Sequence, residues 1–267
     1  MAISLSYLFL SVHSALQVAY PKVLGSFIDG LIAKDYSYVA YMLTTFFGLI
    51  LFGYISHIYD TKVFSKIYRR FASIETNKQF NGGVDTSIIN GRLGMMRSVI
   101  NFFEHDMRYM LNTFYLLLGS LYFIFITEPM LIPYLSISVA LTLTVTYIYA
   151  PEISKLTQRN NDLTEIQTKT VGERSISALN NLLRTTQKLS VDFSNLQAKY
   201  YALIQAIAYG TVTLLITYYV VYNQVTVGSV FSTYRYLFDF CGAISSIPVL
   251  LWSFANIRDV IKRLDEE

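Results

Sequence analysis

The stretch that decides the fold is the last one, residues 222–267, which reads YNQVTVGSVFSTYRYLFDFCGAISSIPVLLWSFANIRDVIKRLDEE. A polar turn opens it, an apolar run follows, and a charged segment closes it. The apolar run reaches the roughly 20 residues that a helix needs to cross a bilayer. Two charges interrupt this run, Arg235 and Asp239, and their spacing of four places both on one helix face. Because charges inside a membrane helix are costly, they predict either an ion pair or the lining of a polar cavity.

The composition of the whole chain supports the same conclusion. Of its 267 residues, 53% are hydrophobic and only 15% are charged, whereas a soluble domain carries roughly 25% charged residues. This excludes an ordinary soluble protein. The single cysteine, Cys241, excludes a disulfide framework within the chain. The N-terminus enters an apolar run without the basic start or cleavage site of a signal peptide, so we interpret it as a retained helix.

Five further apolar stretches bring the number of predicted membrane crossings to six. They lie within residues 3–32, 38–57, 109–126, 130–149 and 200–221. Short turns at 33–37, 127–129 and 222–227 alternate with two long connections, about 58–107 and 152–199, that are patterned as helices. Within the first connection, residues 85–91 predict a short helix that ends at Gly91. We expect no strands, because an open sheet edge cannot lie in lipid. The fold class is therefore an all-α membrane protein.

The distribution of Lys and Arg predicts the orientation. Residues 60–109, 151–202 and 256–267 hold 18 of these residues, whereas the three short turns hold one, Lys34. Basic residues accumulate on the cytoplasmic side of membrane proteins. We therefore expect both termini and both long helical extensions to lie in the cytoplasm, in a protein of the cytoplasmic (inner) membrane.

Four segments carry a family resemblance. They are YPKVLGSFIDG at 20–30, NGRL at 90–93, VTVGSV at 225–230 and NIRDVIKRL at 256–264. In their order and spacing they resemble the six-helix transmembrane domain of ABC exporters, a family of ATP-driven export pumps. The resemblance covers residues 1–267 as a single domain and implies a domain-swapped homodimer around a central cavity that helix six lines.

The resemblance also implies contacts with an ATPase. In the family, short coupling helices touch the ATPase domain, and here they correspond to segments near Asp85, Ile88, Arg174 and Ile176. The 267 residues contain no G-x-x-x-x-G-K-[ST] phosphate loop. We therefore expect no nucleotide-binding domain, no cofactor and no enzymatic activity in the chain itself. ATP coupling would need a separate subunit, or is absent.

Three charges are the candidate lining of the cavity. Counted at 1.5 Å per residue from the outer helix ends, Lys22, Arg235 and Asp239 lie at depths of ~10–16 Å. Two interpretations stay open. One is a structural ion pair, Arg235–Asp239 or Lys22–Asp239, that holds helices together. The other is an ion or solute pathway, because intramembrane charges are functional in most cases.

Three histidines are weaker candidates for a metal site. His13, His57 and His105 share a depth near the cytoplasmic interface, but no two are spaced for one helix face. The simpler interpretation is a set of interfacial polar residues, so we predict no metal site.

Three functions remain open from the sequence. The first is a transport or channel-like protein, an ion channel included, that moves a solute or ion through a central homodimer cavity without an ATPase of its own. The second is the membrane subunit of an ABC transporter whose ATPase is a separate polypeptide. The third is a regulatory partner of such a transporter. The expected partners are a second copy of the chain, membrane lipid and, under the second function, a nucleotide-binding subunit, but no nucleic acid.

Overall fold

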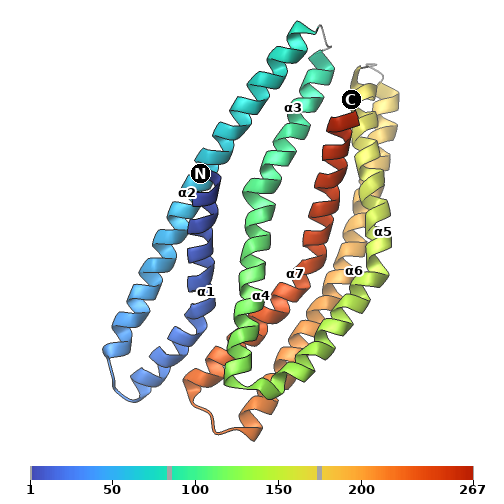
Figure 1. Ribbon diagram of the computed structural model, residues 1–267. Coiled ribbons are helices and arrows are strands. Elements are labelled where there is room, and N and C mark those ends of the chain that lie inside the picture. The colour runs from blue at the N-terminus through green and yellow to red at the C-terminus, as the bar shows by residue number, and fades with distance from the viewer. Residues whose placement is uncertain (1, 83–85, 173–175, 267) are drawn as a thin grey trace. The chain divides into compact units, whose positions relative to one another are not determined.

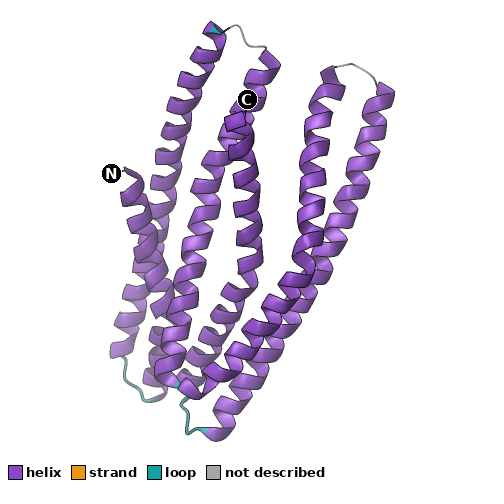
Figure 2. Cartoon of the chain, turned by 45° about the vertical axis from the view of Figure 1, so that its right-hand side comes forward, coloured by secondary structure: helices purple, strands orange, loops and turns teal. Residues whose placement is uncertain are grey.

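The computed structural model describes residues 2–82, 86–172 and 176–266. All regular elements in these ranges are helices, and Figure 2 shows that no strand lies among them. The chain follows the order α1 (Ala2–Ile32), α2 (Ser37–Asn81), α3 (Thr86–Asn101), η1 (Phe102–Asp106), α4 (Met107–Thr127), η2 (Pro129–Leu131), α5 (Ile132–Gly172), α6 (Ile176–Tyr222) and α7 (Val227–Glu266). The all-α fold predicted from the sequence is therefore confirmed.

Six helical runs in the described ranges are long and apolar enough to cross a membrane, as predicted. They are Ile3–Ile32, Ser37–Asn81, Arg92–Thr127, Pro129–Asn160, Ile176–Tyr222 and Val227–Lys262. The turns between them fall where the sequence placed them. In the first turn, Asp35 accepts hydrogen bonds from the side chain and from the backbone N–H of Ser37. These bonds, the side-chain bond most of all, hold the pKa of the Asp35 carboxyl below its usual value.

The first long connection differs from the prediction in one respect. The α2 helix continues from the apolar stretch through the polar residues to Asn81 without a break, as expected. The predicted helix end at Gly91 is wrong, because α3 runs unbroken from Thr86 to Asn101. A glycine inside a helix costs only about 1 kcal/mol relative to alanine, and the residues on both sides have a helical pattern.

A π-helix joins α3 to α4, and the sequence did not predict it. The N–H of Met107 donates to the carbonyl of Phe102, so this hydrogen bond spans five residues, whereas that of an α-helix spans four. The ring of Phe102 packs against Phe254 of α7, with 5.6 Å between ring centroids. The hydroxyl of Tyr7 on α1 donates to the carbonyl of Phe103 at 3.3 Å. The π-turn thus directs neighbouring residues toward α7 and α1.

The chain forms two compact units. The first unit contains residues 1–132 and 214–267. In it α1 packs against α2, α4 and α7, and α4 also packs against α7 (Figure 1). The ring of Tyr236 on α7 is 2% exposed and stacks on Phe123 of α4 at 4.7 Å. This unit holds all the candidate cavity charges.

The second unit contains residues 133–213, which are most of α5 and the larger part of α6. Tyr200 of α6 is fully buried. Its hydroxyl lies 3.2 Å from the hydroxyl of Thr146 on α5, and its ring lies 5.8 Å from that of Tyr149. These contacts join the two helices. The prediction of a single transmembrane domain over residues 1–267 stays a prediction.

Candidate functional site

Arg235 and Asp239 form an ion pair along one face of α7. The Nε and Nη2 atoms of Arg235 lie 3.1 and 3.0 Å from the two carboxylate oxygens of Asp239. Two contacts of this kind pair the opposite charges and also hold the two side chains in one relative orientation. The Asp239 side chain is 9% exposed and that of Arg235 is 46% exposed. The pair therefore holds a buried carboxylate beside a guanidinium that keeps part of its surface open.

Lys22 does not join this pair. Its side chain is exposed on α1, and among the described residues no ion pair links it to Asp239. Its neighbour Pro21 is buried, and the carbonyl of Pro21 accepts a hydrogen bond of 2.9 Å from the hydroxyl of Ser232 on α7. The backbone beside Lys22 is thus fixed against α7, while the Lys22 side chain stays exposed. Of the two ion pairs considered from the sequence, the structure contains Arg235–Asp239.

Asp29 fastens the end of α1 to the start of α7. Its carboxylate accepts hydrogen bonds from the hydroxyl of Thr226 at 2.6 Å and from the N–H of Gly228 at 2.8 Å. The first N–H groups of a helix have no partner within the helix, and a carboxylate is the preferred partner. Thr226 and Ser229 complete the cap, because each side-chain oxygen accepts the other residue's N–H.

The backbones of α1 and α7 touch at this point. A Cβ atom on Gly25 would collide with the carbonyl of Gly228, and one on Gly228 would collide with the carbonyl of Gly25. Both glycines are therefore needed for the close approach of the two helices. In the sequence, Asp29 and Gly228 stand out only as parts of the family segments. An acid in the last turn of one helix, together with a Thr-x-x-Ser cap, was the signal for this contact.

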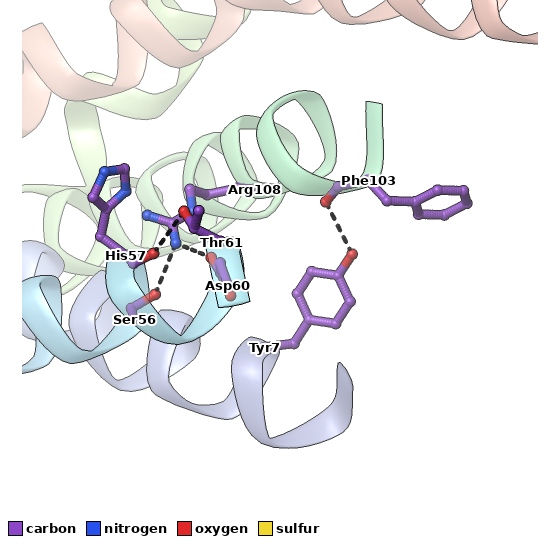
Figure 3. Close-up of polar contacts among 7 residues, drawn as sticks. All are labelled: Tyr7, Ser56, His57, Asp60, Thr61, Phe103 and Arg108. Atoms are coloured by element: carbon purple, nitrogen blue, oxygen red, sulfur yellow. Dashed lines mark hydrogen bonds and ion pairs between the residues drawn. The ribbon is translucent and has the colours of Figure 1, made fainter. Parts of the chain in front are cut away.

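A second polar group joins α2 to α4, and Figure 3 shows it. Arg108 of α4 forms an ion pair with Asp60 of α2 and donates to the hydroxyl of Ser56 at 3.3 Å. Asp60 is 4% exposed and Ser56 is 1% exposed. This pair was not predicted from the sequence. Asp60 and Arg108 are the charges nearest the apolar stretches 38–57 and 109–126, and this equal depth was the available signal.

The three histidines lie on α1, α2 and η1. His13 is half-buried on α1, where its ring packs against Gly53 of α2, whereas His57 and His105 are exposed. Among the described residues no three or more His, Cys, Asp or Glu side chains gather as metal ligands do. The histidines therefore remain weak candidates for a metal site.

The residues suggested for coupling to an ATPase fall mostly outside the described parts of the chain. Asp85 and Arg174 are not described, and Ile88 is described only as part of the α3 backbone. Ile176 is the first residue of α6, and its side chain is 77% exposed.

An apolar groove of about 360 Å³ lies where α6 ends and α7 begins. It is lined by Ile216, Val227, Val230, Phe231 and Tyr234. Arg235 is the residue after Tyr234, and its guanidinium lies 6.0 Å from the centre of the Phe238 ring. The groove and the ion pair thus occupy adjoining turns of α7.

Comparison with known proteins identifies one family. A family model described as an ABC transporter transmembrane region matches residues 1–229. No curated protein matches the chain. The matched range includes α1 to α6, the turn before α7 and the two glycines that bring α1 and α7 together.

Proposed function

The chain belongs to the family of ABC transporter transmembrane regions, and on that premise we propose that two copies of it enclose a pathway for a solute or ion. It is an integral membrane protein of the transport type, with six membrane-length helices. The observation that supports the proposal most directly is the Arg235–Asp239 pair. It places two charges within a membrane-spanning helix, where polar groups are retained mainly for function or for specific pairing.

The proposed pathway is lined by α1 and α7. Lys22 and Arg235 both keep exposed surface, so each has a cationic group available to a passing anion or to a hydrated cavity. Asp239 is held by Arg235 and sets the local charge balance. While Arg235 pairs with it, the Asp239 carboxylate adds little electrostatic field to the pathway. Once separated from Arg235, its negative charge would favour the passage of cations. In this proposal the chain acts as a transport protein and not as an enzyme, and it moves its solute without binding ATP itself.

The Asp239→Asn substitution tests this function. We expect it to preserve folding and dimerisation but to change flux or ion preference several-fold in liposomes, because it leaves the Arg235 charge unbalanced in the pathway. The measurement is solute or ion flux from vesicles with and without nucleotide. Asp35→Asn, in the exposed turn before α2, is the matched control and should change neither quantity.

A purely structural pair gives a different outcome. In that case Asp239→Asn lowers thermal stability, and adding Arg235→Gln restores it, because the double change removes both charges. Unchanged flux together with lowered stability would reject the pathway.

The second candidate function is that of a membrane subunit served by a separate ATPase. It is favoured by one observation, the exposed Ile176 at the start of α6, an apolar side chain available to a partner. Under this function a nucleotide-binding protein should co-purify with the chain, and flux should depend on ATP. Flux from the purified chain without nucleotide would instead favour the first candidate.

The proposed orientation, with both termini in the cytoplasm, has its own test. In a Cys241→Ala background, single cysteines at Ser37 and Gln224 should react with an impermeant reagent added outside cells. Cysteines at Lys78 and Arg159, which are equally exposed, should react only after the membrane is opened. The reverse pattern would show the opposite orientation.

A further inference from the structure

The α2 helix carries four basic side chains just beyond its apolar stretch, and we call them the basic strip: Lys62, Lys66, Arg69 and Arg70. All four are exposed. At 3.6 residues per turn they fall within about 100° of the helix surface, so they share one face. Residues 61–74 contain no Asp or Glu. This face of α2 therefore presents four positive charges and no negative charge.

No acid of the described chain neutralises the basic strip by an ion pair. The two acids of α2 are engaged elsewhere, because Asp60 pairs with Arg108 and Glu75 accepts a hydrogen bond from Gln79. Residues 152–165 of α5 also follow an apolar stretch, but they hold two basic and three acidic residues. The excess of positive charge is thus a particular property of α2, and a partner for the strip has to come from outside the chain.

The face that carries the basic strip is exposed within the apolar stretch as well. Leu51 lies about five turns before Arg69, and Tyr41 lies about eight turns before Arg70, so both point in the direction of the strip. Their side chains are 38% and 65% exposed. An exposed apolar or aromatic face on a membrane-spanning helix is suited to lipid. The strip therefore extends a lipid-compatible face beyond the hydrocarbon core.

The basic strip begins close to the lipid headgroups. Counted from Tyr38, the roughly 20 residues that cross the hydrocarbon core end near His57. The two lysines then lie roughly 7–14 Å beyond the core, and the two arginines lie roughly 18–20 Å beyond it. Headgroups fill about the first 5–8 Å, and the field of their charges extends about 8–10 Å further. The lysines are within this field, and the arginines are at its edge.

The direction of α2 brings the charges closer to the bilayer. In an α-helix each side chain leans toward the N-terminus and covers the preceding turn, which is about 5 Å away. Because α2 leaves its apolar stretch toward the C-terminus, its basic side chains lean back toward the headgroups. The α6 helix enters its apolar stretch toward the C-terminus, so its exposed Arg184 and Lys188 lean away from that stretch.

We propose that the basic strip binds the headgroups of anionic phospholipids in the leaflet from which α2 emerges. A cluster of four or more Lys and Arg next to a membrane helix attracts anionic lipid, and both side chains donate charge-assisted hydrogen bonds to phosphate oxygens. The bilayer is already beside the strip, whereas a second copy of the chain would bring the same positive charges to it. The proposal depends neither on the solute nor on the orientation of the protein.

Electron spin resonance of spin-labelled lipids tests the strip in the full chain. The protein is reconstituted in phosphatidylcholine vesicles with a trace of spin-labelled phosphatidylglycerol or phosphatidylcholine, and the immobilised fraction of each label gives its relative association. The wild type should prefer phosphatidylglycerol, and Lys62→Gln with Lys66→Gln should lower this preference about twofold, since the signal averages over all lipids around the protein. Arg69→Gln with Arg70→Gln should lower it less, because the arginines lie farther from the headgroups.

The matched control is Arg184→Gln with Lys188→Gln, which removes the same charge from exposed positions on α6. It should keep the preference of the wild type. Molar salt should abolish that preference, because it shortens the range of the field to about 3 Å.

Three results would overturn the proposal. They are an unchanged preference in both strip variants, whether or not the oligomeric state changes, an equal loss in the α6 control, and a preference that survives molar salt. All substituted side chains are exposed, so each variant should elute from a sizing column as the wild type does. If one strip variant does not fold, the other variant and the salt dependence still decide.

Discussion

Replacing Gly228 with alanine is expected to cost about 3 kcal/mol of stability, which is a large effect for a single methyl group. The added Cβ would collide with the carbonyl of Gly25, and forcing extra atoms into a packed contact costs typically 1–3 kcal/mol. The helices must separate to make room. The hydrogen bond from the N–H of Gly228 to Asp29 would then lengthen, with a further loss of about 1 kcal/mol.

The measurement is the apparent melting temperature of the purified protein in one detergent. Gly242→Ala is the matched control because it lies on the same helix and has no atom within 4 Å of the position that its Cβ would take. It should be neutral or slightly stabilising, since alanine favours a helix more than glycine does. Equal melting temperatures for Gly228→Ala and Gly242→Ala would show that the contact between α1 and α7 does not form.

Replacing Arg108 with methionine is expected to destabilise the protein by about 3–5 kcal/mol, the usual cost of removing one partner from a buried ion pair. Methionine keeps the length of the aliphatic stem but removes the charge. Asp60, at 4% exposure, would then remain buried without its cation, and Ser56 would lose the guanidinium that now donates to it. The measurement is again thermal unfolding in detergent.

A double substitution separates charge from packing in this prediction. Adding Asp60→Asn to Arg108→Met removes the uncompensated carboxylate, so a large part of the lost stability should return. The control is Arg235→Met on α7, where the guanidinium is half exposed. Removing this guanidinium should lower the stability clearly less than Arg108→Met does. If the double variant is no more stable than Arg108→Met alone, the cost comes from packing and the ion pair is not its cause.

The sequence was sufficient for the fold because membrane insertion leaves few choices. A run of about 20 apolar residues has to be a helix in lipid, and six such runs with short polar turns fix the number of crossings. The local ends of helices were harder to predict. The sequence predicts a helix end at Gly91 because many helices end at a glycine, yet α3 continues through it. The π-helix depends on contacts made by Phe102 and Phe103 with other helices, which no local pattern reports.

For the candidate site, spacing predicted only what lies within one helix. Arg235 and Asp239 are four residues apart, so their pairing could be foreseen. The contacts of Asp29 with Gly228, and of Asp60 with Arg108, join residues 199 and 48 positions apart in the chain. Such contacts depend on how helices cross and which faces meet. Equal depth in the membrane was the signal for Asp60 and Arg108, and an acid in the last turn of one helix with a Thr-x-x-Ser cap on another was the signal for Asp29. Neither signal selects a partner.

The π-helix between α3 and α4 makes the length of the chain at that point part of the structure. An α-helix turns by about 100° per residue, whereas the wider π-turn takes up one extra residue within a single turn. Removing one residue from 102–106 would let this turn close as an α-helix, and its side chains would be redistributed around the helix. Phe102 would then lose its present orientation toward Phe254. In an alignment this change would be a gap of a single letter, but in the protein it would remove a contact between two helices.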